Sequence, residues 1–135
     1  MTIAQAEQFF TTYRDGFNAA DASAVTSHYA FPCMFSQSKV PAVFAEHAEL
    51  LANNEKLVAN YLADGFERAD FTIEGLQSYG EQHAAADVAW TIRRTAKPPV
   101  MFRTAYALRH FDAAWKVWAV TVYEEKQAYA AAGLS

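Results

Sequence analysis

The sequence has little cysteine and glycine and no excess of basic residues. A single cysteine, Cys33, stands among 135 residues, so an internal disulfide is excluded and a reducing compartment, the cytoplasm, is expected. Eleven Lys and Arg against fifteen Asp and Glu give a net charge of −4, which argues against a nucleic-acid partner. The five glycines are scattered and form no phosphate-binding loop.

Long apolar runs are also missing. Charges interrupt every hydrophobic stretch well before the roughly 20 residues that a membrane-spanning helix needs, and no secretory leader is recognised, so no membrane partner is expected. No two histidines or cysteines have metal-ligand spacing, and neither a metal nor another cofactor is expected. A composition that is 53% hydrophobic and 15% aromatic predicts one folded domain over residues 1–135.

The first half of the chain has a helical period. Thr2 and Gln5 form a capping-box pattern, after which aromatic residues recur at helical spacing and predict a helix over about 3–19. Asp21 predicts the N-cap of a second, short helix that runs through Ser27, because its side chain can accept from the free N–H groups of a first turn.

A strand and a third helix are expected next. Residues 31–35 are compact and apolar, and the proline among them favours the first residue or edge of a strand. Pro41 suits the first turn of a helix, because its missing N–H costs nothing there. Phe44 and His47 would share one face of this helix, and Asp64-Gly65 would end it.

After residue 65 the apolar residues alternate with polar or small ones. This period of two predicts strands over about 71–79, 88–93, 102–109 and 115–123. The turns between them are too short for parallel crossovers, so the strands must pair antiparallel. Helices that precede an antiparallel meander predict an α+β fold, with the helices on one face of the sheet.

Two segments resemble the NTF2-like superfamily, in its SnoaL-like and ketosteroid-isomerase-like branches. The segment from Phe9 to Asp21 resembles the opening helix and its Asn-Ala-small-Asp ending, and residues 108–118 resemble the last hairpin, where a turn precedes Trp-basic-aliphatic. The element order matches over nearly the whole chain. The resemblance implies an NTF2-like (cystatin-like) cone, in which N-terminal helices pack on a strongly curved antiparallel sheet and an apolar pocket opens at one end.

The resemblance also implies which residues face that pocket. Tyr13 matches the ketosteroid isomerase tyrosine that donates to the oxyanion, and Phe17 would add to the helical wall. Gln37 falls where that enzyme has its general-base aspartate, and Ala107 where its second oxyanion donor stands. Because an amide cannot take up and deliver a proton at neutral pH, steroid-isomerase chemistry is not expected.

The match to the last hairpin predicts which alternate residues of the last two strands face the pocket. It places Arg103 inside, where the guanidinium could bind a ligand carboxylate or pair with Glu124. On the final strand the same match assigns to the cavity Trp118, Val120, Val122 and Glu124. A slip of one residue would exchange the faces and bring in Phe102, Thr104 and Tyr106.

Three functions stay open on the sequence. The first is a pocket for a small apolar or polyketide-like molecule, in a binding protein or an enzyme, with Tyr13 as its main polar anchor. The second is a non-catalytic homodimeric scaffold or interaction module, whose outer sheet face, with Trp90, Trp115 and Tyr123, would contact a twin.

The third function is a dehydratase or hydrolase. Scytalone-dehydratase-like members of the family use pocket histidines, and of the histidines here only His47 is expected on an apolar helical face, beside Phe44 and Leu51. Glu124 is the other candidate base. A histidine in that position can equally be a core or rim residue, so the sequence assigns no catalytic residue.

Overall fold

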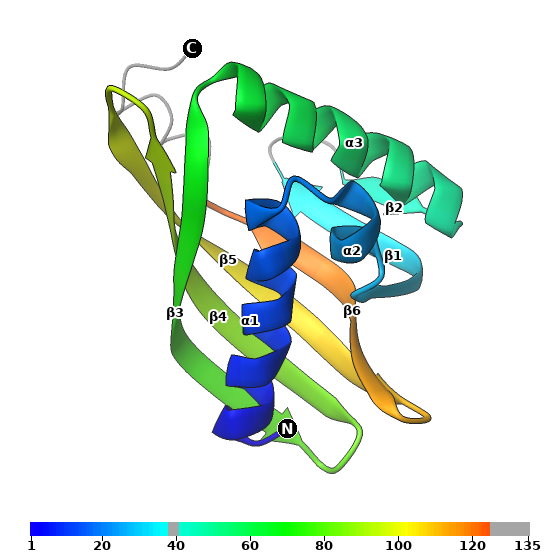
Figure 1. Cartoon of the computed structure of the whole chain (residues 1–135). Helices are drawn as coiled ribbons and strands as arrows, with labels where there is room; N and C mark the ends of the chain where they lie inside the picture. The colour runs from blue at the N-terminus through cyan, green and yellow to red at the C-terminus, as the bar shows by residue number, and fades with distance from the viewer. Residues whose placement is uncertain (38–40, 125–135) are drawn as a thin grey trace.

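The computed structural model describes residues 1–37 and 41–124 of the chain, without the side chain of Gln37. In this part three helices and six strands follow one another (Figure 1): α1 (Ile3–Asn18), α2 (Ala22–Thr26), β1 (Tyr29–Gln37), β2 (Ala42–Phe44), α3 (His47–Ala63), β3 (Phe66–Tyr79), β4 (His83–Arg94), β5 (Lys97–Phe111) and β6 (Ala114–Val122).

The strands form one curved sheet in the order β2-β1-β6-β5-β4-β3. β3 to β6 are the antiparallel meander that the sequence predicts. β1 lies parallel to β6, which makes the sheet mixed, and β2 folds back on β1 as an antiparallel partner. α1 crosses the sheet and α3 spans its upper end on the same side (Figure 1), which confirms the α+β fold with its helices on one face.

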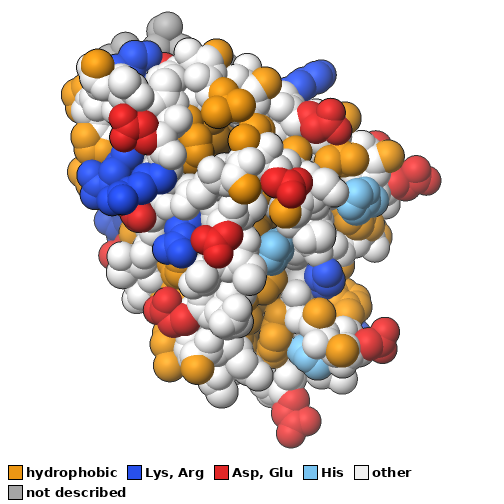
Figure 2. All heavy atoms as spheres, viewed as in Figure 1, with side chains coloured by type: hydrophobic (Ala, Val, Ile, Leu, Met, Phe, Trp, Pro, Cys, Tyr) orange, Lys and Arg blue, Asp and Glu red, His pale blue; other side chains and the backbone are white. Residues whose placement is uncertain are grey.

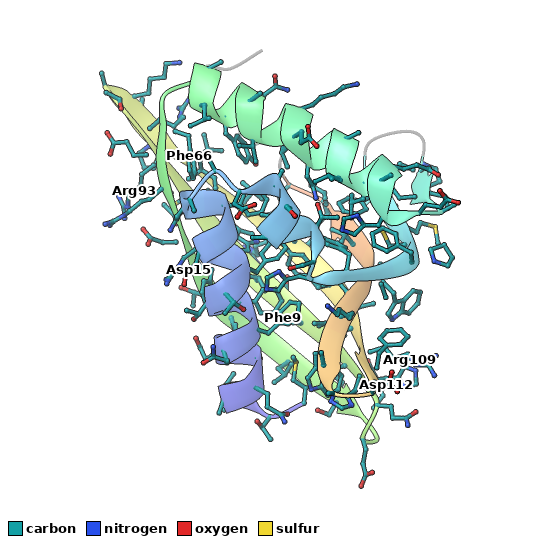
Figure 3. The ribbon with its side chains drawn as sticks, turned by 45° about the vertical axis from the view of Figure 1, so that its right-hand side comes forward. Phe9, Asp15, Phe66, Arg93, Arg109 and Asp112 are labelled. Atoms are coloured by element: carbon teal, nitrogen blue, oxygen red, sulfur yellow. The ribbon has the colours of Figure 1, made fainter. Side chains whose placement is uncertain are left out.

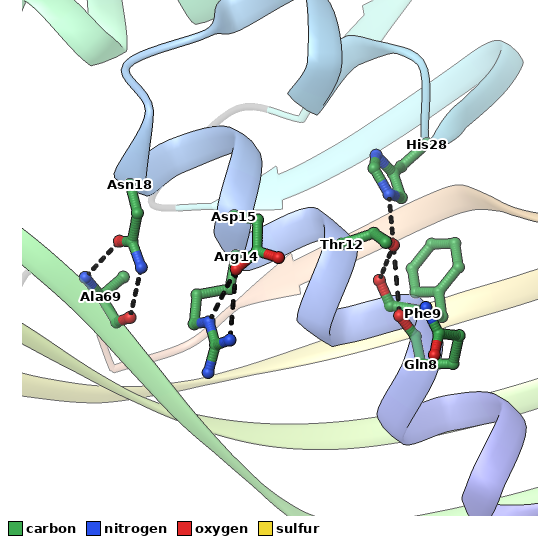
Figure 4. A network of polar contacts seen from close by, with 8 residues as sticks. All are labelled: Gln8, Phe9, Thr12, Arg14, Asp15, Asn18, His28 and Ala69. Carbon is green, nitrogen blue, oxygen red and sulfur yellow. Dashed lines mark hydrogen bonds and ion pairs between the residues drawn. The ribbon is translucent and has the colours of Figure 1, made fainter.

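α1 owes its position to one apolar face and to hydrogen bonds at both ends. Thr2 and Gln5 make the reciprocal capping box that the sequence predicts. Phe9 points from α1 into the molecule, whereas Asp15 points away from it (Figure 3). At the C-terminal end, the amide of Asn18 accepts from Ala69 N at 2.7 Å and donates to Ala69 O at 3.3 Å, so it binds α1 to β3 (Figure 4).

The predicted start of the third helix is wrong. Residues 42–44 after Pro41 form β2, and α3 begins at His47. β2 pairs with the free edge of β1, where Cys33 lies opposite Phe44, and the ring of Phe44 packs edge-on against Phe35 at 5.4 Å. The backbone partners on β1 decide the conformation of this short segment, because a proline is compatible with either a helix start or an edge strand.

The far end of α3 is fixed by a charged cluster. Arg94 carries a buried guanidinium that donates to Asp64 Oδ2 at 3.1 Å and to the carbonyl oxygen of Pro98. Lys97 Nζ lies 2.6 Å from Asp64 Oδ1. Lys97 first and then Arg94 lower the pKa of Asp64, which therefore remains ionised and holds α3 over the sheet.

The lone cysteine is a core residue. Cys33 is 2% exposed and belongs to the main hydrophobic cluster between the helices and the sheet. Burial raises the pKa of its thiol to about 11, so the group stays protonated at neutral pH. It packs as a small hydrophobic side chain.

Candidate functional site

A cavity of about 350 Å³ lies between the helices and the concave face of the sheet. Its walls come from α1, α3 and the strands, and hydrophobic side chains gather in a hollow near α3 in Figure 2. The lining residues are Tyr13, Phe17, Tyr29, Phe35, Phe44, Asn53, Asn54, Lys56, Leu57, Asn60, Tyr61, Phe66, Ala69, Trp90, Ile92, Phe102, Thr104, Tyr106, Val120 and Val122. Aromatic residues dominate this wall, as is usual for small-molecule sites.

The cavity opens beside α3. Asn53, Lys56 and Asn60 are exposed and recur at helical spacing, so they form the rim. Lys56 is the one charged residue in the described lining, and Asp, Glu and His are absent from it. The interior therefore offers hydrogen bonds and apolar surface, with a single cation at the entrance.

The deep wall carries a continuous chain of hydrogen-bonding groups, which we call the tyrosine chain: Trp90, Tyr106, Tyr13 and Tyr29. Trp90 Nε1 donates to Tyr106 Oη at 3.0 Å, and the hydroxyl oxygens of Tyr13 and Tyr29 lie 2.7 Å apart. Tyr106 and Tyr13 are hydrogen-bonded as well. All four residues are buried, and together they connect β4, β5, α1 and β1.

The tyrosine chain is made of neutral donors. Burial raises the pKa of Tyr29 well above its usual value, and the neighbouring Tyr106 adds to the effect. Burial and then Tyr13 do the same for Tyr106. Because an indole N–H can only donate, Tyr106 accepts from Trp90 and can pass its own proton to Tyr13. If Tyr13 then donates to Tyr29, the last hydroxyl proton, on Tyr29, is left for a ligand oxygen.

Tyr13 and Phe17 stand in the lining, where the sequence places them. Their rings contact each other at a centroid distance of 5.3 Å. Their part in binding a ligand stays a prediction. Tyr29 also lines the cavity, but the sequence does not distinguish it from the other aromatic residues that could belong to the wall or the core.

The parity assigned to β5 is wrong. Arg103 lies on the outer face, with Nε 3.4 Å from Glu74 Oε1 and 3.6 Å from Glu124 Oε2. It does pair with Glu124, one of the two expected partners, but outside the cavity. The opposite parity holds instead, and the residues that line the cavity are Phe102, Thr104 and Tyr106.

The prediction that Trp118 faces the cavity is also wrong, whereas Val120 and Val122 do line the cavity. Ala107 pairs with Ala119 but Leu108 pairs with Val117, so Trp118 is an extra residue in β6. Because a bulge adds one residue, the alternation of inward and outward side chains shifts by one position between the two sides of the bulge. Trp118 is consequently 42% exposed.

The two candidate bases stand outside the described lining. His47 is exposed at the start of α3 and packs against the ring of Phe31 at 5.7 Å. Phe44 lies in β2, so the predicted helical face that includes it is not formed. Glu124 lies beside Arg103. The backbone of Gln37 pairs with Val122, but its side chain is outside the described part of the chain, so its role stays a prediction.

His28 occupies a separate, shallow groove on the other side of α1, together with Trp115 and Lys116. Its Nε2 lies 3.1 Å from Thr12 Oγ1 (Figure 4). Its Nδ1 lies 2.9 Å from Ala24 O. Burial lowers the pKa of this histidine. Both ring nitrogens have protein partners, so the imidazole links α1 to α2 and is not directed at the main cavity.

The outer-face residues also need correction. Trp90 is buried in the tyrosine chain and Trp115 lines the groove beside α1, so neither lies on the outer face of the sheet. Tyr123 is exposed and donates to Asp87 Oδ1 at 2.8 Å. In residues 1–37 and 41–124, the His, Cys, Asp and Glu side chains form no cluster that could hold a metal ion, and the helices include none long and apolar enough to cross a membrane.

Comparison with known families decides the family question. Residues 4–125 match the model of a family described as "NTF2-like protein (DUF6841)". The chain belongs to this NTF2-like family. The resemblance drawn from its first helix and last hairpin is therefore confirmed. No curated protein matches the chain.

Solved NTF2-like structures share the fold at low sequence identity. An NTF2-like protein of unknown function from Shewanella oneidensis has a TM-score of 0.75 at 16% identity, over 90% of this chain and 98% of that one. A domain with a cystatin-like fold from Nostoc punctiforme reaches 0.72 at 13% identity, over 97% and 86%. A protein with a ketosteroid-isomerase-like fold from Catenulispora acidiphila, in complex with trimethylamine, reaches 0.62 at 16% identity, over 94% and 93%.

Proposed function

We propose that this NTF2-like protein binds a small, mostly apolar molecule in the cavity and holds an oxygen of that molecule at Tyr29. The single observation that carries the proposal is the tyrosine chain in the wall of a 350 Å³ space. Apolar walls supply most of the affinity of such sites, and a few fixed polar groups orient the ligand. The related fold from Catenulispora acidiphila in complex with a small molecule supports this reading.

The lining favours binding over acid–base catalysis. A general base must lie within hydrogen-bonding reach of the proton that it removes. Neither His47 nor Glu124 is among the described lining residues, and a tyrosine whose pKa is raised stays protonated at neutral pH and cannot accept a proton there. The dehydratase or hydrolase alternative therefore has no supporting geometry among the described side chains.

Tyr29→Phe tests the oxygen site. We expect the variant to bind 2-acetylnaphthalene, whose ketone can only accept a hydrogen bond, roughly tenfold more weakly than the wild type, which is the effect of one lost hydrogen bond. Binding of 2-ethylnaphthalene should stay within about twofold, because that probe has no oxygen. Quenching of tryptophan fluorescence, or calorimetry, gives both dissociation constants.

The matched control is Tyr79→Phe, which removes the hydroxyl of an exposed tyrosine at the end of β3. It should leave the affinity for both probes unchanged. If the wild-type protein binds neither naphthalene, the proposed function is wrong. If Tyr29→Phe binds both as the wild type does, the oxygen is not held at Tyr29.

We also propose that two copies of the chain associate through the outer face of the sheet. Ala85, Ala107 and Ala119 lie opposite one another on β4, β5 and β6, and this row of small side chains leaves the backbone open to close approach. Exposed Tyr123, which donates to Asp87 two residues from Ala85, adds aromatic surface on the same face. A sheet face with small side chains at its centre can pack closely against a second sheet.

Ala107→Arg tests this association. Sedimentation of the wild type should give twice the 15.0 kDa mass of one chain at micromolar concentration. The arginine places a charge in the middle of the alanine row, so the variant should sediment as a monomer with an unchanged far-UV spectrum. A wild-type monomer, or a variant that remains dimeric, contradicts the proposal.

A further inference from the structure

Asn54 is a polar residue on the buried face of α3. It is 3% exposed and lies between the apolar residues Leu50 and Val58, which are also buried. It nevertheless lines the cavity. A buried amide without full hydrogen bonding costs stability, so each polar atom of Asn54 is expected to have a hydrogen-bond partner.

One side of this amide is fixed by Thr26. The Thr26 hydroxyl, which is fully buried, donates to Ala22 O at 2.7 Å. Having used its proton, that hydroxyl can only accept from Asn54, and Asn54 Nδ2 lies 3.0 Å from Thr26 Oγ1. The contact therefore decides which end of the amide is nitrogen and which is oxygen.

The rest of the amide makes no hydrogen bond to a described residue. Oδ1 and the second Nδ2 proton remain available, in a residue that contributes to the cavity wall. An acceptor next to a donor matches a hydroxyl group, which can donate to Oδ1 and accept from N–H. An ether or a ketone can use only the N–H, and it leaves Oδ1 unpaired.

We propose that Asn54 determines the specificity of the cavity for a neutral ligand that carries a hydroxyl or N–H group, as in a phenol or an alcohol. This inference rests on the proposed binding function and adds the ligand class. The ligand would have two polar points, an oxygen held at Tyr29 and a donor received by Asn54, joined by an apolar body along the aromatic wall. A carboxylate fits less well, because its oxygens are repelled by Oδ1.

Asn54→Leu tests the inference with 2-naphthol and 2-methoxynaphthalene, which differ in one methyl group that removes the donor. Wild-type protein should bind 2-naphthol more tightly than the ether. The variant should bind 2-naphthol roughly tenfold more weakly, the effect of one hydrogen bond to a buried neutral group. Its affinity for the ether should stay within about threefold of the wild-type value.

Thr26→Val is the matched control for a purely structural role. It removes the same contact between α2 and α3, yet Thr26 is not among the residues that line the cavity, and the variant keeps the Asn54 amide itself. It should retain most of the preference for 2-naphthol. Equal losses of that preference in both variants would mean that Asn54 only supports the helix pair, and this would overturn the inference.

The wild-type protein alone gives a second test, which holds even if Asn54→Leu does not fold. Equal affinities for 2-naphthol and its methyl ether would overturn the role of Asn54 but leave the proposed function intact. Failure of 2-naphthol, 2-methoxynaphthalene and 2-ethylnaphthalene alike to bind would instead remove the proposed function. The two proposals can therefore fail separately.

Discussion

Phe10→Ala should lower the free energy of unfolding by about 3–5 kcal/mol, the usual cost of truncating a buried phenylalanine. Phe10 is fully buried, and its ring centroid lies 5.0 Å from that of Tyr106 and 6.1 Å from that of Phe71. It thus packs behind the tyrosine chain. Because the cavity lies next to Phe10, few side chains are available to move into the space that the ring leaves. The loss of unfolding free energy should therefore lie near the upper end of that range.

Urea unfolding followed by tryptophan fluorescence measures this loss, and Phe111→Ala is the control. Phe111 is 39% exposed at the end of β5, so its truncation should cost less than about 1 kcal/mol. If Phe10→Ala lowers the free energy of unfolding no more than Phe111→Ala does, α1 and the sheet have moved together to fill the space. Aromatic packing around Phe10 would then not be what keeps the cavity open.

Leu57→Trp should abolish binding of naphthalene-sized probes, with affinity falling by more than about tenfold, because an indole at this position occupies the space that the ligand needs. Leu57 is a half-buried lining residue on α3, between the rim residues Lys56 and Asn60. Filling an existing space adds apolar contact, so the melting temperature should stay the same or rise.

The control for this substitution is Leu62→Trp, which adds the same side chain to the same helix. Leu62 is 54% exposed and is not among the lining residues, so probe binding should be unaffected. Calorimetric titration with 2-ethylnaphthalene compares the two. If Leu57→Trp binds this probe as the wild type does, the binding site lies elsewhere in the protein.

The elements that the sequence predicts well are those whose signals are local. The capping-box pair Thr2 and Gln5 predicts where α1 begins, and the spacing of the aromatic residues after it predicts which face of the helix is buried. Alternation likewise predicts the antiparallel meander. The start of α3 could not be predicted in this way, because residues 42–44 become a strand only through pairing with β1.

The site was harder to predict than the fold because it depends on strand register. Arg103 and Thr104 belong to adjacent positions of one strand, and both alternating sets on β5 contain residues that suit either face. The bulge at Trp118 has no distinctive residue to mark it. Asn54 did carry a signal, because an amide interrupts the apolar stripe of α3, and such an interruption indicates a specific partner.

Among the described strands, β3 has β4 as its one neighbour and so lies at the edge of the sheet. Unpaired N–H and C=O groups on such an edge recruit strands from other molecules and promote aggregation. At Ala69 both groups are taken up by Asn18. The Asn18 side chain thus binds the backbone groups that an additional strand would bind. At this point of the edge it hinders pairing with a strand of another molecule.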